Sequence, residues 1–141
     1  IFLRDKKIDY CRGCYFCQDH AGQCAIKDDV PAIVDKMIKA DIIVMSTPVY
    51  FYCMNAQLKT VIDRSVMKWR DINGKGLYLI ATAAEDGAHA FEGTIKSYHG
   101  FVECLDNARE EGMILAGGVY NIGEIASHHA LGQAYEAGRQ V

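Results

Sequence analysis

The stretch Asp41-Ile-Ile-Val-Met-Ser-Thr-Pro-Val-Tyr-Phe51 decides the fold, together with Asn55-Ala-Gln-Leu-Lys-Thr-Val-Ile-Asp-Arg64, which follows it. Residues 42–45 are an unbroken apolar run, typical of a parallel strand that is covered on both faces. Pro48 has no N–H to donate, so we expect the strand to end near Thr47. A turn then lies at the carboxyl end of the strand, where open α/β sheets bind ligands. Its three aromatic residues, 50–52, would suit a flat and largely apolar ring.

Strand and helix patterns alternate along the rest of the chain. Apolar runs predict strands at residues 1–3, 77–83 and 113–118. Apolar residues at helical spacing predict helices that begin near Val30, Asn55, Phe91 and Ser127, with Asn55 and Ser127 as N-caps. This alternation predicts the α/β class, with a parallel sheet between helices in a three-layer sandwich.

Composition narrows the class of protein. With 141 residues, half of them hydrophobic, the chain is expected to form one domain over residues 1–141. A net charge of −3 gives no reason to expect nucleic acid or an anionic membrane as partner. No apolar run is as long as a transmembrane helix. Six cysteines amid clear strand and helix patterns indicate metal or redox chemistry in a reducing compartment, for which we expect the cytoplasm.

Four of the six cysteines lie in the loop Cys11-Arg-Gly-Cys14-Tyr-Phe-Cys17-Gln-Asp-His-Ala-Gly-Gln-Cys24. The first three share the spacing that begins the cluster-binding run of bacterial ferredoxins, and Cys24 is near enough to supply a fourth thiolate. Thiolates also bind zinc and copper(I), and His20 continues the three-residue spacing of a Cys3His zinc site. Spacing alone therefore leaves an iron–sulfur cluster, zinc and free thiols open. The isolated Cys53 and Cys104 are interpreted as small buried hydrophobic residues.

A set of segments spread along the chain carries a family resemblance. These are the cysteine loop, Lys27-Asp-Asp29, Thr47-Pro-Val-Tyr-Phe51, Asn55-Ala-Gln-Leu-Lys59, Ile62-Asp-Arg64, Ala90-Phe-Glu-Gly-Thr94 and Ala116-Gly-Gly-Val-Tyr120. Together they resemble the NAD(P)H-dependent FMN reductase family, and within it the iron–sulfur flavoprotein branch of the flavodoxin-like fold.

The resemblance implies a cofactor and two sets of site residues. The ring of an FMN would lie against Thr47, Pro48, Val49, Tyr50 and Phe51. Its polar edge would face Ala83, Ala84 and Glu85. NAD(P)H would pass a hydride to the flavin, and electrons would continue to a small-molecule or protein acceptor. A [4Fe-4S] cluster would be held by Cys11, Cys14, Cys17 and Cys24.

The resemblance has further implications and one gap. It implies a homo-oligomer, and no side chain is needed as a catalytic acid or base because the redox chemistry belongs to the cofactor. Members of the family begin with a strand, a phosphate-binding loop and a helix that have no counterpart in this sequence. We therefore expect an N-terminally incomplete domain that binds FMN weakly or not at all. A non-enzymatic electron carrier and a zinc-binding interaction module are the alternative functions.

Overall fold

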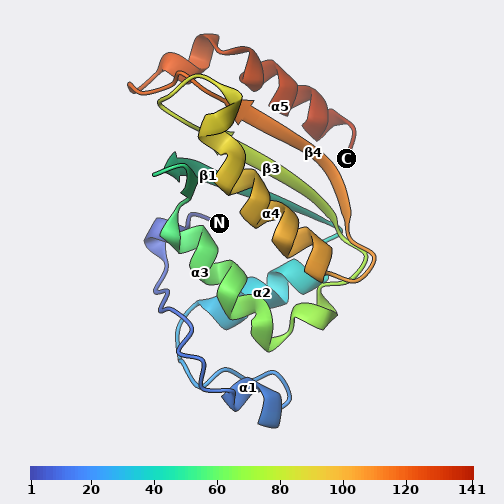
Figure 1. Ribbon diagram of the computed structural model, residues 1–141. Helices are drawn as coiled ribbons and strands as arrows, with labels where there is room; N and C mark the ends of the chain where they lie inside the picture. The colour runs from blue at the N-terminus through green and yellow to red at the C-terminus, as the bar shows by residue number, and fades with distance from the viewer.

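A four-stranded sheet with helices on both faces forms the protein (Figure 1), in a computed structural model that describes residues 1–141. The strand order is β2-β1-β3-β4, where β1 is Ile42–Tyr50, β2 is Cys53–Met54, β3 is Gly76–Thr82 and β4 is Arg109–Ala116. β1, β3 and β4 are parallel, and the short β2 returns antiparallel to the end of β1. The predicted α/β class and parallel sheet are confirmed.

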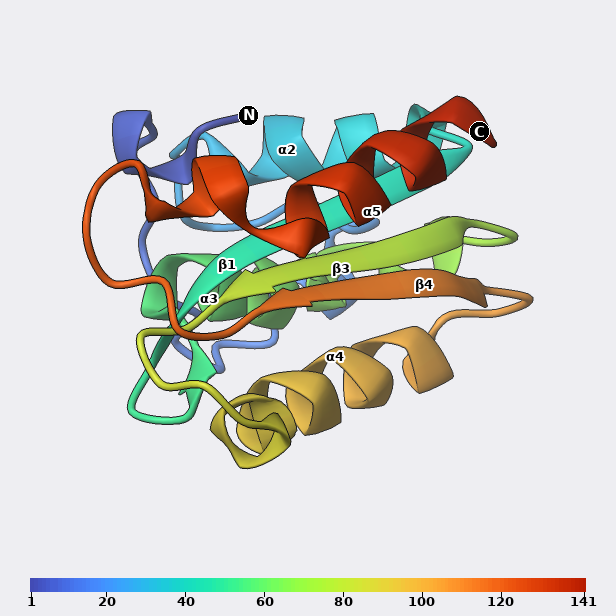
Figure 2. The ribbon, with the colours of Figure 1, turned by 90° about the horizontal axis from the view of Figure 1, so that it is seen from above.

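The helices divide between the two faces of the sheet. They are α1 (Phe16–Asp19), α2 (Val30–Lys39), α3 (Ala56–Arg64), α4 (Glu92–Cys104) and α5 (His129–Arg139). Figure 2 shows the sheet between α4 and α5, so the predicted sandwich is present. Apolar residues of α2, α3 and α4 join one core with β1 and β3, while Ala130 of α5 packs on Ile114 and Ala116 on the opposite face. None of these helices combines the length and the apolar character needed to cross a bilayer.

The main core joins the apolar stripe of α2 to buried residues of α3, α4, β1 and β3. Val30 and Val34 of α2 and Leu77 and Leu79 of β3 are wholly buried. Burying each such side chain stabilises the fold by about 1.5–3 kcal/mol. Tyr98 of α4 is also buried, and its hydroxyl donates to the Leu77 carbonyl at 2.9 Å, which fixes α4 to the sheet.

Strand β1 is longer than its sequence predicts. β1 continues to Tyr50, with Pro48 paired opposite Thr82 of β3, so the expected end near Thr47 is wrong. The reason lies in the other edge of β1, which pairs with β2 only at Val49 and Tyr50. A residue without an N–H is tolerated in a strand whose free edge has no ladder to supply.

Two other predictions are corrected at the ends of the chain. Residues 1–3 are not a strand, because no strand pairs with them, and a 3₁₀ turn at Leu3–Asp5 takes their place. The cap of α5 is His128, whose Nδ1 accepts from the Ala130 N–H at 3.1 Å, and not Ser127. The predicted cap of α3 is confirmed, because the Asn55 side chain accepts from the Leu58 N–H at 2.9 Å.

Two glycines of α4 give a matched test of how closely this helix approaches the β1–β2 hairpin. A Cβ on Gly93 would lie 2.3 Å from the Tyr52 carbonyl oxygen, whereas one on Gly100 would meet nothing within 4 Å. We expect Gly93→Ala to lower the free energy of unfolding by about 1–3 kcal/mol, because backbone must move. Gly100→Ala should raise it by up to about 1 kcal/mol through helix propensity. Urea denaturation of the two variants compares them, and equal effects would contradict the close approach.

Candidate functional site

The four cysteines of the loop surround one cavity. Cys11 and Cys14 precede α1, Cys17 lies within it, and Cys24 lies between α1 and α2. In Figure 1 this loop extends beyond the end of α3. All four cysteines line a cavity of about 220 Å³, to which α3 contributes Arg64. The structure therefore brings together the four predicted metal ligands around one space.

The thiols gather around this space without converging on a point. None of the six cysteines is in a disulfide, and no three His, Cys, Asp or Glu side chains lie close enough together to hold a metal ion. His20 does not line the cavity: its ring stacks on Phe16 with centroids 3.6 Å apart, and its Nδ1 lies 2.9 Å from the Phe16 carbonyl oxygen. Cys24, and not His20, is thus the fourth soft donor that the fold places there.

Left-handed backbone shapes the cysteine loop. Tyr15 and Ala21 have φ values of 57° and 50°, a conformation that side chains with a Cβ seldom adopt. Gly22 has φ 77°, and a Cβ there would lie 2.9 Å from the Met67 carbonyl oxygen, so glycine lets the loop close against the 3₁₀ turn at Ser65–Met67. Strained residues of this kind gather at functional sites.

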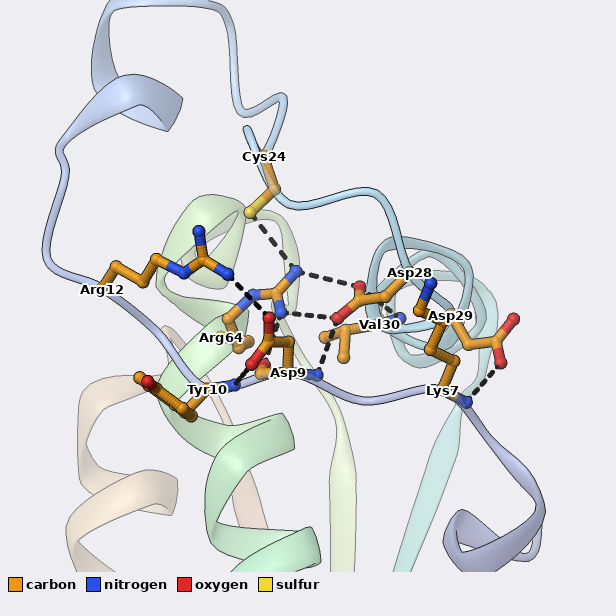
Figure 3. Close-up of polar contacts among 9 residues, drawn as sticks. All are labelled: Lys7, Asp9, Tyr10, Arg12, Cys24, Asp28, Asp29, Val30 and Arg64. Carbon is orange, nitrogen blue, oxygen red and sulfur yellow. Dashed lines mark hydrogen bonds and ion pairs between the residues drawn. The ribbon is translucent and has the colours of Figure 1, made fainter.

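A buried ion pair fixes the cysteine loop to α3 (Figure 3). The side chains of Arg64 and Asp28 are each 1% exposed. Arg64 Nη1 donates to Asp28 Oδ2 at 2.8 Å, and Nη2 donates to Asp28 Oδ1 at 3.0 Å. The guanidinium also donates to the Asp9 carbonyl at 2.6 Å and to Cys24 Sγ at 3.3 Å. One cation therefore connects the segments on either side of the cysteine loop to the end of α3.

The pair holds both of its members in the charged form. Burial alone would raise the pKa of Asp28, but hydrogen bonds from Arg64 and from the Asp9 and Val30 N–H groups outweigh it, so the pKa is lowered. Burial alone would lower the pKa of Arg64, but Asp28 outweighs it and the pKa is raised. The guanidinium is not fully satisfied, because its buried Nε donates no hydrogen bond.

Sequence reasoning gave Arg64 and Asp28 no role in the site. A signal was available: Arg64 follows Leu58 and Val61 at steps of three, so it belongs to the inward face of α3. An arginine on a buried face needs a buried acid, and Asp28 is on the short segment between Cys24 and α2. The expected burial of Cys104 is wrong, because it is exposed at the end of α4, and Cys53 is half-buried.

The predicted aromatic turn is a tight hairpin between β1 and β2. Phe51 and Tyr52 both have positive φ, 50° and 62°, as the two central residues of a type I′ turn do. Such turns ordinarily use Asn and Gly, so two aromatic residues there are under strain. Phe51 is wholly exposed and Tyr50 is 61% exposed, so neither side chain stabilises the core.

The Thr47 side chain connects the end of β1, next to this turn, to the start of α3. It is buried, its hydroxyl donates to the Pro48 carbonyl at 2.8 Å, and the same oxygen accepts from the Asn55 N–H at 3.0 Å. Asn55 begins α3, so the first turn of the helix and the end of β1 are joined through one side chain. Pro48 and Val49 are partly buried between them.

The second predicted loop emerges beside the first. β1 and β3 pair in parallel up to Pro48 and Thr82, so residues 47–51 and 83–85 leave the same edge of the sheet. Ala83 is buried and its N–H donates to the Ala116 carbonyl at 2.9 Å. Ala84 and Glu85 are exposed, and their N–H groups donate to no acceptor in the protein. Free N–H groups at this edge can donate to the polar edge of a bound ring.

Glu85 also links the two loops through charge. Contact with the Glu85 carboxylate raises the pKa of Tyr52, while Tyr52 and His89 lower the pKa of Glu85. Glu85 Oε1 lies 2.7 Å from His89 Nε2. The hairpin and the loop after β3 are thus neighbours in space, as the sequence predicts.

Comparison with known families decides what kind of protein this is. The family described as NADPH-dependent FMN reductase matches residues 1–107. The chain belongs to this family. Thus the predicted family is confirmed, and the reductase fold explains why ring-binding loops were expected at the carboxyl edge of the sheet.

The curated relatives of this FMN reductase family member carry a more specific name. An iron-sulfur flavoprotein of Methanosarcina thermophila is 33% identical over 129 residues, which is 89% of this chain and 63% of the relative. An iron-sulfur flavoprotein of Methanocaldococcus jannaschii is 48% identical over 65 residues, 46% of this chain and 33% of the relative. The chain thus spans from about a third to under two thirds of the lengths of these relatives.

Comparison with solved structures supports the fold independently of the sequence matches. The Trp repressor binding protein of Bacillus subtilis superimposes with a TM-score of 0.68 at 22% identity, covering 77% of this chain and 75% of that one. An FMN-dependent NADH-azoreductase of Bacillus anthracis, solved in complex with FMN, gives a TM-score of 0.65 at 15% identity and covers 99% of this chain and 79% of its own. These likenesses confirm the flavodoxin-like fold.

Proposed function

We propose that the protein is an FMN-dependent NAD(P)H oxidoreductase that also carries a [4Fe-4S] cluster at Cys11, Cys14, Cys17 and Cys24. One observation carries the proposal: four cysteines line one cavity at one end of α3, while the other end of α3 is hydrogen-bonded to the predicted ring-binding turn. The family match and the names of the curated relatives support it.

The chain's own groups fit a flavin ring at the carboxyl edge of the sheet. When bound, FMN accepts a hydride from NAD(P)H and gives up electrons one at a time. The N–H groups of Ala84 and Glu85 are free to donate to the pyrimidine edge of the ring. Tyr50 and Phe51 offer exposed aromatic surface to its apolar part, and Thr47 holds their turn in place.

The cysteine cavity fits a cluster by its chemistry. Four thiols are the ligand set of a [4Fe-4S] cluster, which relays single electrons when bound. The thiols are free, and the cavity they line also contains Arg64, a buried cation whose Nε has no acceptor. A buried N–H group without a partner is rare in proteins.

The proposal extends to assembly and location. A second copy of the chain would cover the aromatic turn, where Phe51 and Tyr50 leave apolar surface exposed. Free thiols in the number seen here are kept reduced in the cytoplasm, which we propose as the location. The electron acceptor is a small molecule or a protein.

FMN binding and reduction test the flavin half of the proposal. Phe51→Ala is expected to raise the dissociation constant for FMN roughly two- to tenfold, because an aromatic contact contributes about 0.5–1.5 kcal/mol. Quenching of FMN fluorescence measures it. The control is Tyr135→Ala, which removes another exposed aromatic residue, on α5. Equal affinity in all three proteins would contradict the ring site.

Hydride transfer separates an oxidoreductase from an electron carrier. Rapid anaerobic mixing of the FMN-loaded protein with NADPH or NADH should bleach the flavin absorbance. A carrier that never binds nicotinamide would leave the absorbance unchanged, and that result would remove the enzymatic part of the proposal.

A further inference from the structure

Arg64 is the buried cation of the cysteine cavity. Two arginines line the cavity, Arg12 and Arg64. The Arg12 side chain is 61% exposed, so water screens its charge. The Arg64 side chain is 1% exposed, and its Nη2 donates to Cys24 Sγ at 3.3 Å. A buried fixed charge acts far more strongly on its neighbours than a charge at the surface.

One hydrogen-bond donor of the Arg64 guanidinium, its Nε, has no acceptor in the protein. Its terminal nitrogens are occupied by Asp28, the Asp9 carbonyl and Cys24 Sγ. Its Nε is buried and has no acceptor. A buried donor left unsatisfied costs about 1–3 kcal/mol, so the other hydrogen bonds of Arg64 must outweigh this cost.

We propose that Arg64 positions Cys24 and raises the reduction potential of the cluster in this cavity, a role that rests on the proposed cluster site. Hydrogen bonds to the sulfurs and net charge both set the potential of iron–sulfur clusters. Reduction adds negative charge, which a buried guanidinium stabilises. The N–H that donates to Cys24 Sγ draws electron density from the sulfur. This effect also favours the reduced form, so it raises the reduction potential as the positive charge does.

Asp28 gives the inference a sign test. Its carboxylate accepts from both terminal nitrogens of the guanidinium, one of which also donates to Cys24 Sγ (Figure 3), and it partly offsets the positive charge. Removing the charge of Asp28 should therefore shift the potential upward, while removing the charge of Arg64 should shift it downward. A purely structural pair would not produce shifts of opposite sign.

The experiment compares variants that have been loaded anaerobically with iron and sulfide. Midpoint potentials from dye-mediated titration, followed by visible absorbance and electron paramagnetic resonance, are measured for wild type, Arg64→Gln, Arg64→Lys, Asp28→Asn and Arg12→Gln. We expect Arg64→Gln to favour the oxidised form at least tenfold, which is 59 mV for a one-electron couple. Arg64→Lys should recover part of that shift, and Arg12→Gln should shift the potential much less.

Three outcomes are decisive. Arg64→Gln with an intact cluster and an unchanged potential overturns the inference while leaving the cluster proposal standing. If wild type takes up no iron and sulfide, the cluster proposal fails and the inference with it. Should Arg64→Gln unfold, the double variant R64Q/D28N keeps an amide at both positions without buried charge. The double variant is then compared with Asp28→Asn, from which it differs only at Arg64: an equal potential overturns the inference, and a lower one supports it.

Discussion

Cys24→Ser is expected to leave the protein unable to hold a stable four-iron cluster. A serine hydroxyl is a hard and weakly acidic donor, whereas iron–sulfur clusters select soft thiolates. Loss of a partner outside the ligand set already costs roughly 10–100-fold in metal affinity, so loss of a ligand should cost at least that. Iron and sulfide content after anaerobic loading, with the visible spectrum, measures the effect.

Two controls separate the ligand set from the rest of the loop. His20→Ala should load as wild type does, because His20 stacks on Phe16 and does not line the cavity. Cys104→Ser should also load normally, since Cys104 lies at the end of α4. A protein that binds zinc, loses it in His20→Ala and never holds iron would instead establish a Cys3His zinc site.

Asp28→Ala is expected to lower the free energy of unfolding by about 3–5 kcal/mol, because it leaves the Arg64 charge buried and unpaired. The matched control is Asp35→Ala. Asp35 also pairs with one cation, Lys68 at 2.9 Å, but its side chain is 49% exposed, and such pairs contribute about 0–1 kcal/mol. Urea denaturation of the metal-free proteins compares the two, and equal losses would contradict the buried pair.

The ion pair of Asp28 with Arg64 makes the free energy of unfolding depend on pH in acid. The pKa of Asp28 is lowered in the folded protein, so its stabilising effect is fully present above the unfolded pKa, about 3.9. The effect disappears as the pH falls through the folded pKa. Wild type should therefore lose stability below about pH 4 more steeply than Asp28→Asn. Thermal unfolding followed between neutral and acid pH tests this, and parallel curves would contradict it.

Local patterns predicted the elements better than their pairing. The apolar run at residues 42–45 and the Asn55 cap were sufficient to place β1 and α3, because burial and capping depend on nearby residues. The end of β1 and the conformation of residues 1–3 depend on which strands pair with them, and the sequence pattern does not indicate that pairing. The two-residue strand β2 escaped prediction because its turn uses Phe51 and Tyr52 instead of Asn and Gly.

The site divides in the same way. The resemblance implied one site for Cys11, Cys14, Cys17 and Cys24, and these cysteines line one cavity. Parallel pairing of β1 with β3 brings the two loops that we propose to bind the ring to one edge of the sheet. Arg64 and Asp28 are 36 residues apart, and their contact depends on how the loop folds back over α3. Charged residues usually lie at the surface, and no local pattern links two residues so far apart in the sequence.

Helix α3 has a consequence for electron flow. It has nine residues between Asn55, which is hydrogen-bonded to Thr47 in the turn that we propose to bind the ring, and the end where Arg64 donates to Cys24. At 1.5 Å per residue the helix is about 13 Å long, and this length separates the elements that hold the two proposed redox sites. Inserting one helical turn would lengthen that gap by about 5.4 Å and slow any transfer across it. The rate at which the two sites exchange electrons would then be encoded in the length of a helix.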